Sequence, residues 1–212
     1  MANSKRFHSL SSRLKELRKH LLPKNFSATG SYSRRQHDLA KSYRLLTHAE
    51  IESFLEEISR LKMTSKIVEW MRNKKPSNSI VYLLTFYHAG GSEKEGEDLV
   101  NFLLSERTEV KIQESAEAAV TAALKQYMGK IISNNGVKQA DLKKMVLPLG
   151  IKSEDLDPSW LLLLDSFGSS RGDVAHNAGT FTREINPEDE YNLINDLLVG
   201  LKKLDEMIFK MK

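Results

Sequence analysis

The sequence predicts an all-α protein. Apolar residues recur at three- and four-residue steps through several long windows, which is the spacing that places them on one side of a helix. Two dipeptides, Asp157-Pro158 and Asn186-Pro187, have the form of helix starts. We find neither an internal repeat nor a convincing β-hairpin pattern in the sequence. Together these observations favour a helical bundle.

Composition limits the class of protein. The chain has 212 residues, of which 40% are hydrophobic and 28% charged, the balance of a globular protein with a core of its own. We expect a helical domain over residues 35–212 and a basic helix with a loop over residues 1–34; two small subdomains are the alternative. Lys and Arg number 32 against 28 Asp and Glu, a net charge of +4, which permits a polyanionic partner without demonstrating one. Cysteine is absent and no segment reads as an export signal or a membrane span, so we expect a cytoplasmic protein with no membrane contact.

The first half of the chain predicts three helices. The first ends before Pro23, and its polar face is basic. A long helix is expected over residues 35–62, followed by a separate short helix over residues 64–73. The first helix has its apolar face at Phe7, Leu10, Leu14, Leu17 and Leu21, and the long helix has one apolar stripe at Leu39, Tyr43, Leu46, Phe54 and Leu61.

The second half predicts further helices and one clear loop. Residues 80–88, IVYLLTFYH, are too uniformly apolar for periodicity to decide, and we interpret them as a buried helix. Residues 89–97, AGGSEKEGE, read as a loop, and residues 98–133 as a helix. The last helix begins at Pro187, with one apolar side made of Tyr191, Ile194, Leu198, Leu201, Leu204 and Ile208.

The segment RGDVAHN, residues 171–177, stands where a helical pattern should continue. On an unbroken helix Arg171 and His176 would point about 140° apart, so they converge only if the helix ends or kinks nearby. Gly168 and Gly172 are the residues that would weaken it. A converging guanidinium and imidazole would hold a phosphodiester, stabilise charge in the transition state and transfer a proton. The alternative is structural: Arg171 pairs with a surface carboxylate and His176 caps a helix or binds a carbonyl.

Two glutamates on the long helix are further candidates. Glu50 falls within the apolar stripe, and Glu52 points about 200° away, toward a side that is also largely apolar. A carboxylate on an apolar surface needs a cation such as Arg171, or a polar pocket at the edge of the core. The alternative is that both side chains simply reach solvent.

Other familiar site motifs are missing from the sequence. It contains no Gly-rich phosphate loop, no G-x-S-x-G and no H-E-x-x-H. We therefore expect no metal and no cofactor. Metal-ligand spacing is lacking among His8, His20, His37, His48 and His88.

Two segments carry a resemblance to a known family: YRLLTHAEIESFLEEI, residues 43–58, and LDSFGSSRGDVAHN, residues 164–177. They resemble the HEPN superfamily, in particular its RiboL-PSP-HEPN branch. With the helical pattern, the resemblance covers most of residues 35–210 and leaves the first helix unassigned. It implies a HEPN-type helical bundle that dimerises, and a metal-independent endoribonuclease of toxin-antitoxin, antiphage or RNA-processing systems. The hallmark of the family is an arginine and a histidine separated by four to six residues. Arg171 and His176 match it, with four residues between them.

The resemblance also implies roles for neighbouring residues. A glutamate from an earlier helix joins the site in several members, often just ahead of an aromatic and aliphatic pair, so the run ESFL makes Glu52 the closer match and Glu50 the second. The residue after the arginine is often polar, whereas this chain has Gly172, with Asp173 one place later. Asn177 would hold the histidine or a phosphate oxygen, and we count Asp173 with it as a substrate-binding candidate.

The expected function is therefore RNA cleavage by attack of the 2′-hydroxyl on the adjacent phosphorus. One chain supplies one such histidine, so a homodimer would provide both a base and an acid, and Gly168 and Gly172 are small enough to let two backbones approach. We also expect an antitoxin or defence-system partner. Ala178 stands where some members carry a modified tyrosine, so silencing by that modification is not expected. The alternative is a non-catalytic helical module that binds RNA or a protein, with Arg171 as a phosphate contact and His176 structural.

Overall fold

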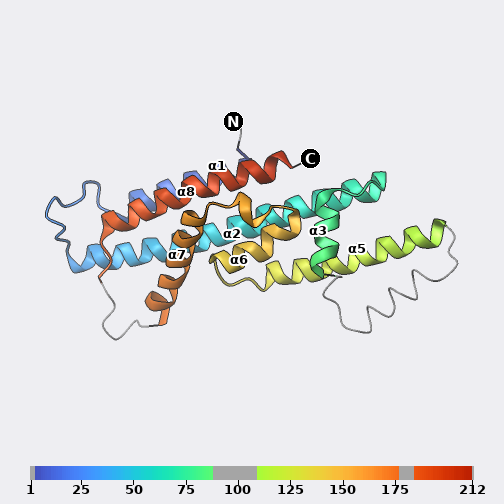
Figure 1. Ribbon diagram of the computed structural model, residues 1–212. Coiled ribbons are helices and arrows are strands. Elements are labelled where there is room, and N and C mark those ends of the chain that lie inside the picture. The colour runs from blue at the N-terminus through green and yellow to red at the C-terminus, as the bar shows by residue number, and fades with distance from the viewer. Residues whose placement is uncertain (1–2, 88–108, 177–183, 212) are drawn as a thin grey trace.

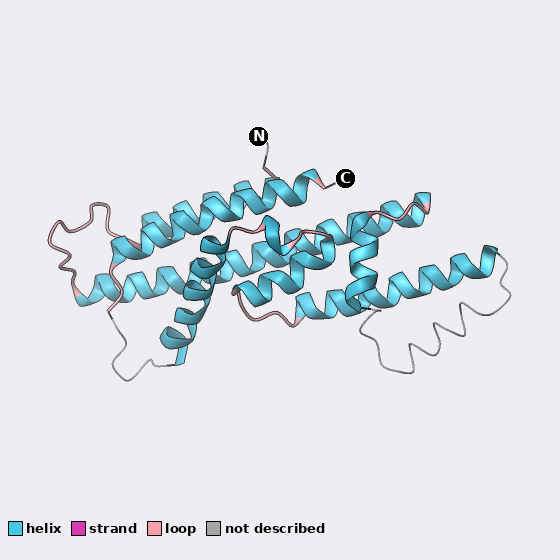
Figure 2. Ribbon diagram, in the orientation of Figure 1, coloured by secondary structure: helices cyan, strands magenta, loops and turns pink. Residues whose placement is uncertain are grey.

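A computed structural model shows a bundle of helices (Figure 1). The structure describes residues 3–87, 109–176 and 184–211, and gives only the backbone for residues 109–113, 115 and 170–176. Within these ranges all the regular secondary structure is helical (Figure 2), which confirms the all-α prediction. The helices are α1 (Lys5–Leu21), α2 (Arg34–Asn73), α3 (Asn78–Tyr87), α5 (Glu109–Ile132), α6 (Gln139–Val146), α7 (Pro158–His176) and α8 (Pro187–Lys210), with short 3-10 turns η1 (Leu147–Leu149) and η2 (Ser153–Asp155).

The first and last helices pack together against α2, as Figure 1 shows for α1, α2 and α8. The expected apolar face of α1 is buried apart from Leu21, which is partly covered. Ser4 caps α1 and joins it to α8, because its backbone N–H and its hydroxyl donate to the two oxygens of the Asp205 carboxylate at 2.7 and 2.6 Å. The first and last helices, far apart in the sequence, therefore contribute to the same hydrophobic core.

α2 is one helix of 40 residues, so the expected division near residue 63 is wrong. No proline or glycine stands between Leu61 and Ser65, and nothing there ends the helix. It begins with a capping box between Ser33 and Gln36 and ends at Lys74, whose left-handed φ of 56° turns the chain ahead of Pro76.

The predicted stripe on α2 is only partly correct. Tyr43 and Phe54 are buried, but Leu46 and Leu61 are 44% and 50% exposed. α2 packs on α1, α8, α7, α6, α3 and α5, and the buried positions on it shift around the helix along its length. Polar side chains also occupy buried positions on it: Thr47, His48 and Ser59.

The two predicted Asx-Pro helix starts are confirmed. The Asp157 Oδ1 accepts from the N–H of Ser159 at 2.9 Å, and the Asn186 Oδ1 accepts from the N–H of Glu188 at 2.9 Å. Each cap satisfies a backbone donor that has no partner within its own helix.

α7 continues through Gly168 and Gly172 and ends at His176, so neither glycine stops the helix and the expected end falls at the histidine itself. Glycine weakens a helix without having to end it. At Gly168 the lack of a side chain serves packing within this chain: a Cβ there would lie 2.7 Å from Cγ and 3.3 Å from the backbone N of Lys138.

The middle of the chain follows the prediction in part. α3 is a helix, as expected, but it buries only Ser79, Ile80 and Leu83, while Val81 and Phe86 are exposed. α5 confirms helix over residues 109–132, and the expected loop at 89–97 lies outside the described residues. No helix in the described part of the chain is long and apolar enough to cross a membrane.

Candidate functional site

The C-terminal half of α7 carries the Arg-x4-His motif. Residues 171 and 176 belong to one continuous helix, on which five positions correspond to about 140° of rotation. On a straight helix of this kind the two positions would not point toward one place within a single chain. Asp173 lies on the same helix, and Asn177 lies outside the described residues.

A contact between α2 and α7 lies one helical turn before the motif. The ring of His48 is buried and stacks on the ring of Phe167, with centroids 5.4 Å apart and an angle of 29° between the planes. Phe167 is four residues before position 171, so the two positions lie on the same side of α7. Position 171 thus follows, one turn later on the same side of the helix, a position that contacts α2.

Glu52 belongs to this contact. Its Oε2 lies 3.6 Å from Nδ1 of His48, one turn earlier on α2, and its side chain is only 15% exposed. The carboxylate is therefore one turn along α2 from the residue that stacks on α7.

Glu50 has different surroundings. Its Oε1 accepts a hydrogen bond from Nε of Arg13 at 3.1 Å, and its side chain is 30% exposed. Hydrogen bonds to Glu50 first and Glu16 second raise the pKa of Arg13 above its ordinary value. Glu50 thus links α2 to α1, whereas Glu52 lies toward α7, a separation that the sequence alone left open.

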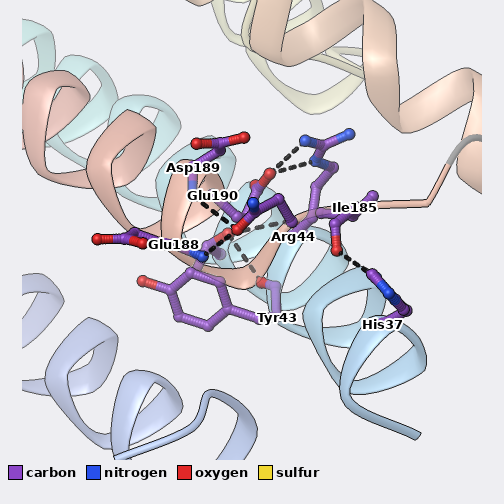
Figure 3. A network of polar contacts seen from close by, with 9 residues as sticks. His37, Tyr43, Arg44, Ile185, Glu188, Asp189 and Glu190 are labelled. Atoms are coloured by element: carbon purple, nitrogen blue, oxygen red, sulfur yellow. Dashed lines mark hydrogen bonds and ion pairs between the residues drawn. The ribbon is translucent and has the colours of Figure 1, made fainter. Parts of the chain in front are cut away.

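A buried ion pair anchors the chain shortly after the motif (Figure 3). Arg44 on α2 donates to Oε2 of Glu190 on α8 through Nη2 and, at 2.8 Å, through Nε. The Glu190 side chain is fully enclosed, and burial, followed by the negative charge of Glu190, raises the pKa of neighbouring Tyr43. Nδ1 of His37 donates to the carbonyl of Ile185 at 2.9 Å. These contacts fix the point at which the chain returns from the motif to α8.

The sequence analysis missed Glu190, although the pattern contains a signal for it. Glu190 lies four residues before Ile194, on the apolar side of α8, where a carboxylate is costly without a buried cation. Elsewhere, within the described residues, we find no group of three or more His, Asp or Glu side chains that would hold a metal ion.

Comparison with known proteins gives one match. The model of the RiboL-PSP-HEPN family matches residues 8–210, from the first turn of α1 to the last residue of α8. No curated protein and no solved structure matches the chain at a significant level. Because the family model spans nearly all of the helices described above, the chain belongs to the RiboL-PSP-HEPN family.

Proposed function

We propose that this protein is an endoribonuclease that cuts RNA without a metal ion, with Arg171 and His176 as its catalytic residues. The observation that carries the proposal is the Arg-x4-His motif in a chain of the RiboL-PSP-HEPN family. The placement of Glu52 adds support, because its carboxylate lies on the α2 surface that packs against the motif helix.

The proposed reaction is a transesterification within the substrate. The 2′-hydroxyl of the RNA loses its proton to an imidazole and attacks the adjacent phosphorus, and a second acid protonates the departing 5′-oxygen. Arg171 neutralises the charge that builds on the phosphorus oxygens, and Glu52 orients a member of the site. Asn177 and Asp173 are proposed to contact the substrate.

A homodimer is part of this proposal. Positions 171 and 176 are about 140° apart on a straight helix, so one copy of α7 does not direct both at one phosphate by its backbone alone. A two-fold axis near the end of α7 would bring two motifs together and supply two imidazoles, one as base and one as acid.

The dimer can be tested by mixing subunits. If both imidazoles are needed, mixtures of wild-type and His176→Ala chains that are co-folded at a fixed total concentration have an activity proportional to the square of the wild-type fraction. A 1:1 mixture then keeps about a quarter of the activity, rather than the roughly one half expected for independent chains. A monomer by light scattering at the assay concentration, or a linear loss, contradicts the composite site.

The catalytic assignment is tested by single substitutions in the full chain. Arg171→Ala and His176→Ala should each lower the cleavage rate by about 10³-fold or more, and the double variant should lose little further. Arg72→Ala and His8→Ala, at exposed positions, are the matched controls. If either motif variant folds, as judged by far-UV circular dichroism, and cuts RNA at the wild-type rate, the assignment is wrong and a non-catalytic RNA-binding or protein-binding module becomes the better description.

The two glutamates form a second matched pair. Both lie on α2, but only Glu52 faces α7. Glu52→Gln should therefore lower kcat by at least tenfold more than Glu50→Gln, because it changes a carboxylate beside the motif rather than one bound to Arg13. Equal losses in the two variants would remove Glu52 from the site.

The products test the chemistry. Cleavage should continue in EDTA and leave a 2′,3′-cyclic phosphate and a 5′-hydroxyl, while DNA and RNA methylated at the 2′-oxygen should resist. Strict dependence on magnesium or manganese, with 3′-hydroxyl and 5′-phosphate products, would instead indicate an attacking water.

We further propose that this activity serves a cytoplasmic toxin or antiphage effector held in check by an antitoxin or another protein of a defence system. Expression of the wild-type chain alone should then slow growth, and His176→Ala should remove the effect. Growth inhibition that persists in His176→Ala would separate the toxicity from RNA cleavage.

A further inference from the structure

The positive charge of the chain is concentrated in its N-terminal hairpin, which we define as α1, the loop after it and the first residues of α2, residues 1–35. This segment contains nine Lys and Arg and a single acidic residue, Glu16, a net charge of +8. The whole chain carries +4, so residues 36–212 carry −4. In net charge, the hairpin is therefore the part of the chain that attracts a polyanion over long range.

Three of the nine cations are held within the fold. Arg6 pairs with Glu57 and Arg13 with Glu50, and both pairs join α1 to α2. Arg18 lies over two aromatic rings at the end of the hairpin. These three side chains contribute to the packing of α1.

The other six cations are exposed. None of them forms an ion pair within the part of the chain that the structure describes. Five of the six belong to the loop end of the hairpin, which we call the basic end: Lys15, Lys19, Lys24, Arg34 and Arg35.

The basic end is held by specific contacts. The Phe26 ring packs on Tyr191 of α8 with centroids 5.7 Å apart, and the Arg18 guanidinium lies 4.8 and 5.0 Å from the two ring centroids. The hydroxyl of Tyr32 accepts from the N–H of Ser27 at 3.2 Å. A loop fixed in this way presents its cations with less ordering cost than a free one.

The basic end is close to the chain that follows the motif. His37, two residues after Arg35, contacts the Ile185 carbonyl and lies 3.6 Å from the Glu184 carboxylate. Figure 1 shows the loop after α1, the start of α2 and the start of α8 at the same end of the molecule. Ile185 is nine positions after His176, so at most about 30 Å of chain separates them.

We propose that the basic end is a phosphate-binding surface that holds the RNA strand beside the bond to be cut. That the bound polyanion is RNA rests on the proposed function. Lysine and arginine on a fixed surface bind successive phosphates without reading bases, so the contact is independent of sequence. Acidic residues in and just before the first turn of α8, Glu184, Glu188 and Asp189, confine the strand to the α1 and α2 side.

The test measures binding in the absence of cleavage. The probe is a fluorescein-labelled single-stranded RNA methylated at every 2′-oxygen, titrated with the full chain at several salt concentrations and followed by fluorescence anisotropy. The variant replaces four cations of the basic end by alanine: Lys19, Lys24, Arg34 and Arg35. The control replaces four exposed cations elsewhere: Arg72, Lys75, Lys125 and Lys130.

The control removes the same charge from a distant place, since Arg35 and Arg72 are about 55 Å apart along α2. We expect the basic-end variant to raise Kd at least tenfold more than the control does. It should also reduce the slope of log K against log salt by about 3, because each lost phosphate contact removes about 0.7. Equal effects of the two variants would overturn the proposal.

A second measurement separates this proposal from the proposed nuclease activity. On a long unmodified RNA the basic-end variant should show a lower kcat/KM, whereas on a dinucleotide too short to reach the basic end it should cut like wild type. If the wild-type protein cuts no RNA and the basic-end variant binds RNA more weakly than wild type, the nuclease proposal is wrong and the phosphate-binding surface is supported. The proposed surface is wrong if the variant binds and cuts long RNA as wild type does. It is also wrong if the wild-type protein binds phosphatidylserine vesicles but not RNA.

Discussion

α7 and α8 begin alike, each with an Asx residue followed by proline, but α8 then carries a buried carboxylate at Glu190 and α7 carries the Arg-x4-His motif near its end. α8 has one buried side along its whole length, from Glu190 to Ile208. α7 has buried side chains from Trp160 to Phe167, before the motif, while Leu162 among them is 66% exposed. The described packing of α7 and its Arg-x4-His motif thus occupy successive parts of one helix. Stability can therefore be tested at the buried positions of α7 without changing a motif residue.

The two helices meet where the large side chain of Trp160 lies on Gly200, which has none. The indole Nε1 of Trp160 donates to the carbonyl of Leu197 at 3.2 Å. A Cβ built on Gly200 would lie 2.2 Å from that nitrogen, so the ring rests directly on the α8 backbone. This contact joins the packed part of α7 to the continuous stripe of α8.

The largest expected effect concerns the buried charge of α8. Glu190→Ala leaves the guanidinium of Arg44 in a largely enclosed place without its carboxylate, so it should lower the free energy of unfolding by about 3–5 kcal/mol. Urea denaturation followed by circular dichroism measures the change. Glu188→Ala, at an exposed position two residues earlier on α8, is the control and should change the free energy of unfolding by less than about 1 kcal/mol.

A smaller loss is expected where α7 meets α8. Gly200→Ala places a methyl group inside the Trp160 ring contact and should destabilise the protein by about 1–3 kcal/mol. Gly129→Ala is the matched control on α5, because a Cβ there meets no atom within 4 Å and alanine favours the helix by about 0.5–1 kcal/mol. If Gly200→Ala lowers the midpoint temperature of thermal unfolding and Gly129→Ala raises it, the contact is supported. A change in the same direction for both substitutions contradicts it.

Because the two helix starts are alike, removing either cap should lower the stability of the protein by a similar amount. Asp157→Ala and Asn186→Ala should each cost about 1 kcal/mol, because each removes an acceptor for a first-turn N–H. Replacement by serine, which also caps helices, should restore most of the stability in both. A loss at only one of the two sites would show that tertiary packing, rather than the cap, fixes the other start.

The smallest effect is expected at Gly168 of α7. The methyl group in Gly168→Ala meets mainly the flexible Cγ of Lys138, and the alanine gains helix propensity, so the net loss should be below about 1 kcal/mol. In a double-mutant cycle, Lys138→Ala should remove most of that loss. A loss above about 3 kcal/mol would mean that the backbone N of Lys138, rather than its side chain, resists the methyl group.

Much of the fold was predictable because it depends on local chemistry. The Asx-Pro caps act within a single turn, and the α8 stripe faces the same core throughout. α2 shows the limit of such patterns: over 40 residues it exchanges one set of neighbours for another, so Leu46 and Leu61 are exposed although they share the spacing of Tyr43 and Phe54.

The candidate site was predictable to a different extent. The motif at Arg171 and His176 is visible in the sequence, and it stays a prediction as a catalytic pair. The choice between Glu50 and Glu52 depends on which helix crosses each side of α2, which no local pattern contains. Buried His48 and Glu190 were missed for the same reason, since a polar residue in a core is recognised only with its partners.

The hydrogen bonds between Ser4 and Asp205 have a consequence for the order of events in synthesis. The two residues are 201 positions apart, so a ribosome adding about 5–20 residues per second needs roughly 10–40 s to make the second after the first. During that interval the first turn of α1 has its serine cap but lacks the α8 carboxylate that secures it. The nascent chain therefore cannot close its core until α8 has emerged, and an interrupted translation yields a chain in which the first helix has no final partner.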